Sequence, residues 1–132
     1  MTAIQKKPQS NYMLVIQAHE GINAQKLQEL MRETQHDKVF FANILHISPK
    51  TIDRYIKEDK KFNPTESEKI LKLEQVYDWG KEVFGNINTF NEWIEEPAYG
   101  LANKIPKTLM QTHGGLALVE EELIRIAYGA LA

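Results

Sequence analysis

The sequence predicts an all-α fold, in which an N-terminal helix-turn-helix bundle is followed by a small helical domain. Three observations support this prediction. Apolar residues recur every three to four positions along most of the chain. These periodic segments begin at residues that favour helix N-caps, and several end at glycine. No segment shows the strict alternation of apolar and polar residues that is typical of a half-buried strand.

The chain begins with a polar stretch, and its first helix is expected from about Tyr12. Residues 1–10 contain one proline and no apolar periodicity, so we expect them to form a flexible tail. In the segment that follows, one helical face carries Tyr12, Val15, Ile16 and His19. Gly21 stands where a glycine often ends a helix.

Three further short helices are predicted from their capping residues. Asn23 is suited to cap a helix that carries Leu27 and Leu30, and Asp37 is suited to cap the next one. Ser48-Pro49 combines a hydroxyl N-cap with proline at the first helical position, which predicts a helix to about Lys57. The charged connector after it ends this part of the chain, so residues 11–61 are predicted to form one domain.

Residues 62–132 are predicted to form the second domain. Asn63-Pro64 repeats the cap-and-proline signal, and a long helix with regular apolar spacing continues to Gly85. A short helix is expected over residues 89–94, and prolines and glycine mark residues 97–106 as irregular. The last helix is expected over residues 115–128, with Gly129 at its end.

Composition excludes several classes of protein. The chain has 132 residues, no cysteine, and 16 Lys+Arg against 18 Asp+Glu, for a net charge of −2. Disulfides and cysteine-based zinc sites are therefore impossible. No apolar run approaches the ~20 residues that span a bilayer, and the first residues lack a secretory h-region, so we expect a cytoplasmic protein without a membrane partner.

The small net charge hides an uneven distribution. Residues 1–72 hold 12 basic and 9 acidic side chains, a balance of +3, whereas residues 73–132 hold 4 and 9, a balance of −5. The two halves are therefore expected to have different partners.

Residues 39–57 carry the spacing of a helix-turn-helix. A small residue is needed where the two helices cross, a left-handed residue at the turn, and an apolar residue inside the second helix. Ala42, His46 and Ile52 fall at the usual intervals. Histidine replaces the common glycine at the turn, and histidine tolerates positive φ better than β-branched residues do.

In this motif the second helix presents its N-terminal end to the major groove of DNA. The residues expected to contact DNA are Ser48, Lys50, Thr51, Arg54 and Lys57. Arg54 is the candidate for bidentate recognition of guanine, and the lysines are suited to neutralising phosphates. The alternative is an ordinary helical hairpin with a solvated basic face.

The second half of the chain carries an ordered set of residues that begins with Pro64, Glu66, Ser67 and Glu68 and ends with Arg125, Ile126 and Gly129. In this set it resembles the toxin-binding domain of the MbcA/ParS/Xre antitoxins. The resemblance extends over about residues 11–132, and its N-terminal part includes the segment LHISPKTIDRY at 45–55. One departure is Ala102-Asn103, where the family commonly has paired glycines. The ordered set of matching residues is Pro64, Glu66, Ser67, Glu68, Gly80, Phe84, Gly85, Trp93, Pro97, Leu101, Pro106, Leu109, Thr112, Gly115, Val119, Leu123, Arg125, Ile126 and Gly129.

This resemblance implies a type II antitoxin, which is not an enzyme and needs no cofactor. Such proteins form homodimers, repress their own operons by binding operator DNA, and bind a cognate toxin through the C-terminal domain. The implied toxin is of the RES type, which consumes NAD⁺. The alternative is a dimeric helix-turn-helix regulator without a toxin partner.

The resemblance also implies that, as in related complexes, the C-terminal end of the antitoxin blocks the active site of the toxin. Arg125 is suited to pairing with a toxin carboxylate one turn before this end. The other predicted toxin-binding residues are Tyr128, Gly129, Ala130, Leu131 and Ala132. The alternative is a frayed end that contacts nothing.

Other features have ordinary structural explanations, and no catalytic or metal-binding set is predicted. The four histidines lack metal-ligand spacing. The acids at 120–122 are expected on a solvated face, and Gly114-Gly115 in a turn. The aromatic residues of the second half, Trp79, Phe84, Phe90 and Trp93, are expected in the core or a dimer interface.

Overall fold

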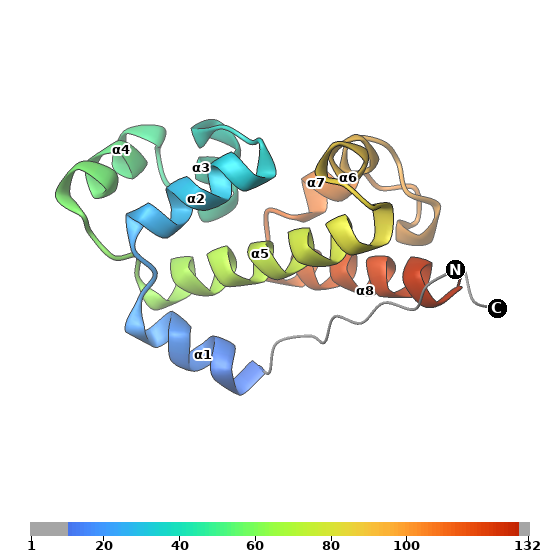
Figure 1. The fold of residues 1–132 in the computed structure, drawn as a ribbon, viewed down its shortest axis with the longest axis horizontal. Coiled ribbons are helices and arrows are strands. Elements are labelled where there is room, and N and C mark those ends of the chain that lie inside the picture. The colour runs from blue at the N-terminus through green and yellow to red at the C-terminus, as the bar shows by residue number, and fades with distance from the viewer. Residues whose placement is uncertain (1–10, 130–132) are drawn as a thin grey trace. The chain divides into compact units, whose positions relative to one another are not determined.

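The computed structural model describes residues 11–129, so the tail expected over residues 1–10 lies outside its scope. Within the described part the chain forms α-helices and one short 3-10 helix, with no strand, and the all-α prediction is confirmed (Figure 1). Two compact units are present, an N-terminal unit (Gln9–Glu74) and a C-terminal unit (Gln75 onward). The division falls inside a long helix, whereas the predicted domain boundary lies between residues 61 and 62.

Five helices contribute to the N-terminal unit, and side chains cap the starts of four of them. The cap oxygens of Asn23, Asp37 and Ser48 each accept a hydrogen bond from a backbone N–H in the first turn, as predicted. Asn63 and Glu66 form a reciprocal capping box, with N···O distances of 2.8 and 3.2 Å. The helices are α1 (Asn11–Glu20), α2 (Ala24–Thr34), α3 (Lys38–Leu45), α4 (Pro49–Glu58) and the first half of α5 (Pro64–Phe84).

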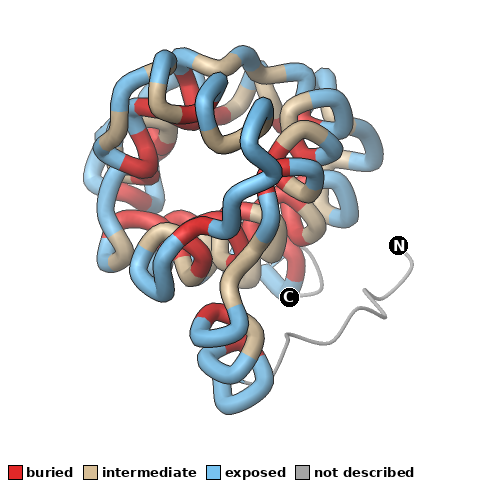
Figure 2. Tube along the Cα trace, turned by 90° about the vertical axis from the view of Figure 1, so that its left-hand side faces the viewer, coloured by how far each residue is buried: buried red, intermediate tan, exposed pale blue. Residues whose placement is uncertain are grey.

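Every helix of this unit contributes buried side chains to its core, and α3 is buried over five of its eight residues. Figure 2 shows buried and exposed residues alternating along the helices. Helix α1 turns a different face inward from the one that its apolar spacing suggests. Its buried residues are Leu14 and Ala18, which pack with Leu71 of α5. Tyr12, Val15, Ile16 and His19, the residues of the shared face, are all exposed.

The C-terminal unit contains the second half of α5, then α6 (Ile87–Ile94), the 3-10 helix η1 (Tyr99–Leu101), α7 (Pro106–Leu109) and α8 (His113–Gly129). Helices α5 and α6 approach closely because Gly80 has no side chain, and a Cβ there would lie 2.5 Å from the ring of Phe90. Trp79 and Phe90 are buried, and the rings of Phe84 and Trp93 lie 5.5 Å apart beside them. The core assignment is therefore confirmed for Trp79 and Phe90.

Two local predictions in this unit are wrong. Gly114 and Gly115 do not form a turn, because α8 already begins at His113 and the Thr112 hydroxyl accepts a hydrogen bond from the Gly115 N–H at 2.9 Å. Glu122 does not lie on a solvated face, because its exposed fraction is 8%. Within residues 11–129, no helix has the length and apolar character needed to cross a bilayer.

Candidate functional site

The turn between α3 and α4 has the geometry that the sequence predicts. Ala42 is buried, and its carbonyl oxygen accepts hydrogen bonds from the backbone N–H groups of His46 and Ile47, the latter at 3.2 Å. His46 adopts a left-handed conformation, with φ 57° and ψ 41°. Ile52 is fully buried, so α4 is fixed to the unit by its middle and exposes its outer face.

The two hydroxyl residues predicted to contact DNA are engaged with each other. The Ser48 Oγ accepts the N–H of Thr51 at 3.1 Å and lies 2.9 Å from the Thr51 Oγ1. Ser48 is exposed and Thr51 is half-buried. These contacts fix the start of α4 and set the direction of both side chains.

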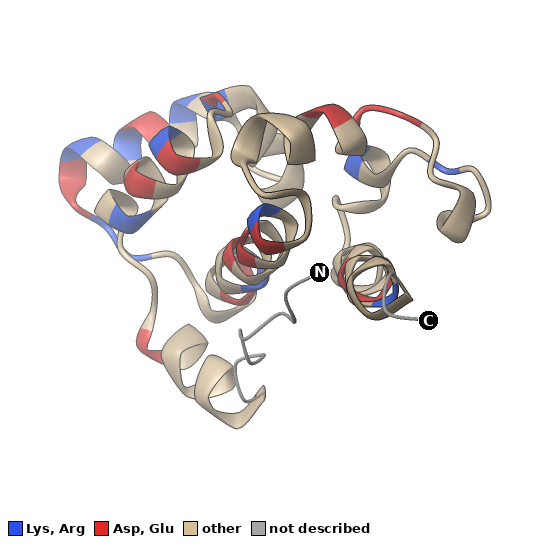
Figure 3. Ribbon diagram, turned by 45° about the vertical axis from the view of Figure 1, so that its right-hand side comes forward, with Lys and Arg blue, Asp and Glu red and all other residues tan. Residues whose placement is uncertain are grey.

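The three basic residues predicted on α4, Lys50, Arg54 and Lys57, are all exposed. One acid, Asp53, lies among them, and the Lys38 ammonium pairs with its carboxylate at 2.8 Å. The Arg54 guanidinium lies 5.6 Å from the centre of the Tyr55 ring, a cation–π distance. Figure 3 shows basic and acidic residues interspersed along the helices of this unit, with α1 nearly free of charge.

A buried lysine that the sequence analysis did not single out supports this turn from behind. The Lys69 Nζ of α5 donates a hydrogen bond of 3.0 Å to the carbonyl oxygen of Ile44, in the last turn of α3. Burial lowers the pKa of Lys69 below its ordinary value of 10.5. This contact satisfies a carbonyl that the helix itself leaves free.

In the C-terminal unit, Arg125 is bound within the chain. Its Nε donates to the Glu122 carboxylate at 2.9 Å, and its Nη2 donates to the carbonyl oxygen of Gly100 at 3.4 Å. Gly100 lies so close to Glu122 that an added Cβ would collide with the carboxylate. Arg125 and Glu122 thus join α8 to the loop that contains η1.

That loop covers residues 98–104 and is closed by its own backbone. Ala98 and Lys104 form an isolated bridge, with an N···O distance of 3.0 Å. Ala102 and Asn103 have φ values of 55° and 62°, in the left-handed region. These are the positions where the resembled family commonly has glycines, so the loop keeps the backbone that glycine favours without having glycine.

The end of α8 is accessible. Tyr128 is 50% exposed, and Gly129 is exposed too. Ala130, Leu131 and Ala132, the other predicted toxin-binding residues, lie outside the described residues.

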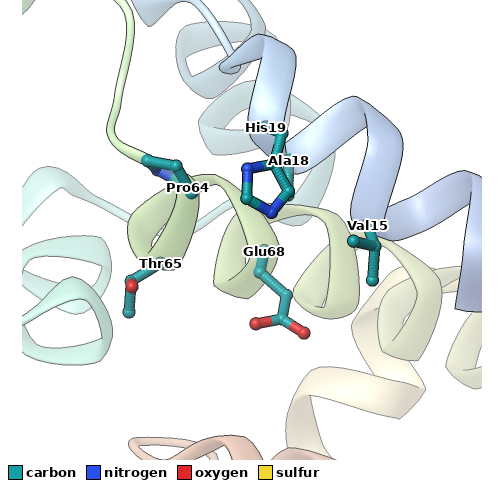
Figure 4. Close-up of a pocket in the computed structure, with 6 residues that line it drawn as sticks. All are labelled: Val15, Ala18, His19, Pro64, Thr65 and Glu68. Carbon is teal, nitrogen blue, oxygen red and sulfur yellow. The ribbon is translucent and has the colours of Figure 1, made fainter.

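A depression of about 240 Å³ in the N-terminal unit lies between α1 and the start of α5 (Figure 4). It contains none of the predicted site residues and is smaller than the ~300–1,000 Å³ of ordinary ligand sites. Residues 11–129 also hold no group of three or more side chains placed to bind a metal ion. The depression is lined by Val15, Ala18, His19, Pro64, Thr65 and Glu68.

A known protein family matches most of the C-terminal unit. None of the curated proteins compared with the chain matches it. The family model of the antitoxin Xre/MbcA/ParS C-terminal toxin-binding domain matches residues 80–129, which run from the second half of α5 to the end of α8. Over residues 80–129 the chain is therefore similar to the C-terminal toxin-binding domain of the Xre/MbcA/ParS antitoxins.

Proposed function

We propose that the protein is the antitoxin of a type II toxin–antitoxin pair and acts in the cytoplasm by binding, without catalysis. The observation that carries this proposal is the toxin-binding family match over residues 80–129. In this proposal, residues 80–129 bind the toxin, and the residues that follow α8 enter the toxin's active site. Exposure of Tyr128 and Gly129 leaves this end of α8 accessible to a partner. The proposed toxin is of the RES type, as the family resemblance implies.

The second part of the proposal assigns DNA binding to α3 and α4 within a domain over residues 11–61. The exposed Lys50, Arg54 and Lys57 support it, because α4 offers cations along its outer face. Ser48 and Thr51 lie at the N-terminal end of α4, where a recognition helix meets base edges. The balance of +3 over residues 1–72 is small, so a homodimer that places two α4 helices on one operator is proposed to supply tight binding.

The test is co-expression with the gene next to the one that encodes this chain. We expect the neighbour to arrest growth when expressed alone and to be harmless with the full-length protein. Deletion of residues 129–132 is expected to abolish protection and to leave operator binding intact. A neighbour that is harmless alone, or that stays toxic beside the full-length protein, contradicts the antitoxin function. Intact operator binding with no toxin complex then supports the regulator without a toxin partner.

A further inference from the structure

Tyr99 is the most exposed of the large apolar side chains in the described part of the chain. Its exposed fraction is 92%, compared with 71% for Tyr12 and 50% for Tyr128. An aromatic ring held almost wholly in water adds little burial to the folded monomer and is available to a partner. Tyrosine is among the residues that dominate the energy of protein interfaces.

The loop that carries Tyr99 is rigidly built. Ala98 and Leu101, on either side of Tyr99 and Gly100, are buried and anchor the loop in the C-terminal unit. Backbone hydrogen bonds close it, including Asn103 N–H to the Ala98 carbonyl at 2.9 Å. Left-handed backbone at Ala102 costs of order 1 kcal/mol, and such strain clusters at binding sites.

Helix α8 holds the loop in place through the residue next to Tyr99. Arg125 donates to the Gly100 carbonyl and pairs with the buried Glu122, which packs against Gly100. These contacts fix the backbone from which the Tyr99 side chain extends. An aromatic side chain on a fixed backbone loses little conformational entropy on binding, which favours affinity.

Helix α8, which contacts this loop, also carries exposed apolar side chains. Leu118 is 47% exposed and Tyr128 is 50% exposed. Arg125 follows Leu118 by seven residues and precedes Tyr128 by three, so the three side chains share one broad face of α8. Arg125 therefore lies between apolar side chains along the helix and contacts Gly100, the residue next to Tyr99.

We propose that Tyr99 is an anchor residue that inserts into an apolar pocket on the toxin, in a contact separate from that of residues 129–132. This inference rests on the proposed antitoxin function. The toxin is the assigned occupant because Tyr99, Leu118 and Tyr128 all lie inside the toxin-binding domain of residues 80–129. Arg125 and Glu122 act as positioning residues, because they fix the loop.

The test measures the affinity of full-length variants for the purified toxin encoded by the adjacent gene, made in a catalytically inactive form. Tyr99→Ala is expected to weaken binding by about 30-fold or more, the loss typical of an anchor residue. Tyr99→Phe is expected to stay within about 10-fold, because the ring is retained. Tyr12→Ala, which removes an exposed tyrosine of the N-terminal unit, is the matched control and is expected to change the affinity less than twofold.

The outcomes separate this inference from the proposed function. If the unaltered chain binds the toxin and Tyr99→Ala binds it equally well, the inference is wrong and the antitoxin function stands. If Tyr99→Ala leaves toxin affinity unchanged but lowers the mass of the free protein, the surface joins two copies of the chain, and the inference is again wrong. If the unaltered chain does not bind the toxin at all, the proposed function itself fails.

A double-mutant cycle tests the positioning role. If Arg125 acts through the loop, Arg125→Ala weakens binding in the unaltered background and has little further effect when Tyr99 is already alanine. Additive losses from Arg125→Ala and Tyr99→Ala would overturn the positioning role, because they mean that Arg125 contributes independently of Tyr99. Thermal unfolding of all four proteins verifies that each is folded.

Discussion

The ammonium nitrogen of Lys69 lies 3.0 Å from the carbonyl oxygen of Ile44, which precedes it by 25 residues in the chain. A lysine with an exposed fraction of 7% is rare in a protein core. Here its ammonium group meets the carbonyl end of α3, where a helix has unsatisfied acceptors and a negative partial charge. The contact supports the short turn that leads into α4.

Lys69→Met is expected to lower the free energy of unfolding by about 1–3 kcal/mol, because it leaves a buried carbonyl without its donor. Chemical denaturation followed by circular dichroism measures the change. Lys72→Met is the matched control, since Lys72 lies on the same helix and is only half-buried, and we expect a change within about 0.5 kcal/mol. Equal losses in the two variants would mean that the Ile44 contact adds no stability.

The same lysine predicts a dependence of stability on alkaline pH. Burial lowers the pKa of Lys69, so the folded protein binds this proton less tightly than the unfolded chain does. The free energy of unfolding therefore rises as the pH increases from below the folded-state pKa toward 10.5. We expect this rise in the unaltered protein relative to Lys69→Met. A difference between the two proteins that stays constant, or falls, over that range would contradict it.

Gly80→Ala is expected to destabilise the C-terminal unit by about 1–3 kcal/mol, because the new methyl group would overlap the Phe90 ring. Gly114→Ala is the matched control. Gly114 lies in α8, and a methyl group added there would have no neighbouring atom within 4 Å, so alanine should raise the free energy of unfolding by about 0.5 kcal/mol. An unchanged or raised free energy of unfolding in Gly80→Ala would show that α5 and α6 can separate at little cost.

Ala102→Gly is expected to raise the free energy of unfolding by about 0.5–1 kcal/mol, because glycine adopts φ 55° without strain. Ala117→Gly, at an exposed position of α8, makes the same chemical change in a right-handed helix and should lower it by about 1 kcal/mol. Thermal or urea unfolding distinguishes the two signs. A loss of stability in Ala102→Gly would mean that the left-handed backbone carries no strain.

Arg54→Ala is expected to weaken operator binding by about 5- to 150-fold, the loss of one base-reading contact, and to affect random duplex far less. Lys57→Ala should weaken both by similar factors and reduce the slope of log affinity against log salt by about one. Fluorescence anisotropy with both duplexes at several salt concentrations measures these effects. Equal losses for Arg54→Ala on both duplexes would show that Arg54 does not read bases.

Local signals made much of the fold predictable from the sequence. Asn23, Asp37, Ser48 and Asn63 cap helices as expected, because a capping side chain acts within three residues of its own position. The positive φ at His46 was predictable from the spacing of the turn for the same reason. The family that matches residues 80–129 was predictable too, since most of the residues that carry the resemblance to the MbcA/ParS/Xre antitoxins lie in that range.

Contacts between distant residues were not predictable in the same way. The burial of Glu122 depends on Arg125 and on a glycine 22 positions earlier, and three consecutive acids conceal which of them turns inward. The burial of Lys69 depends on a carbonyl in another helix. Helix α1 turns Leu14 and Ala18 inward because Leu71 of α5 packs there, and its own apolar spacing does not indicate this.

The positions of the two tryptophans give the molecule an intrinsic optical probe for one half of the chain. Trp79 and Trp93 both belong to the C-terminal unit, and the N-terminal unit contains no tryptophan. Indole emission therefore reports on the C-terminal unit alone, whereas far-ultraviolet circular dichroism reports on the helices of both units. Coincidence of the two signals in one denaturation experiment would establish that the two units unfold in a single cooperative transition.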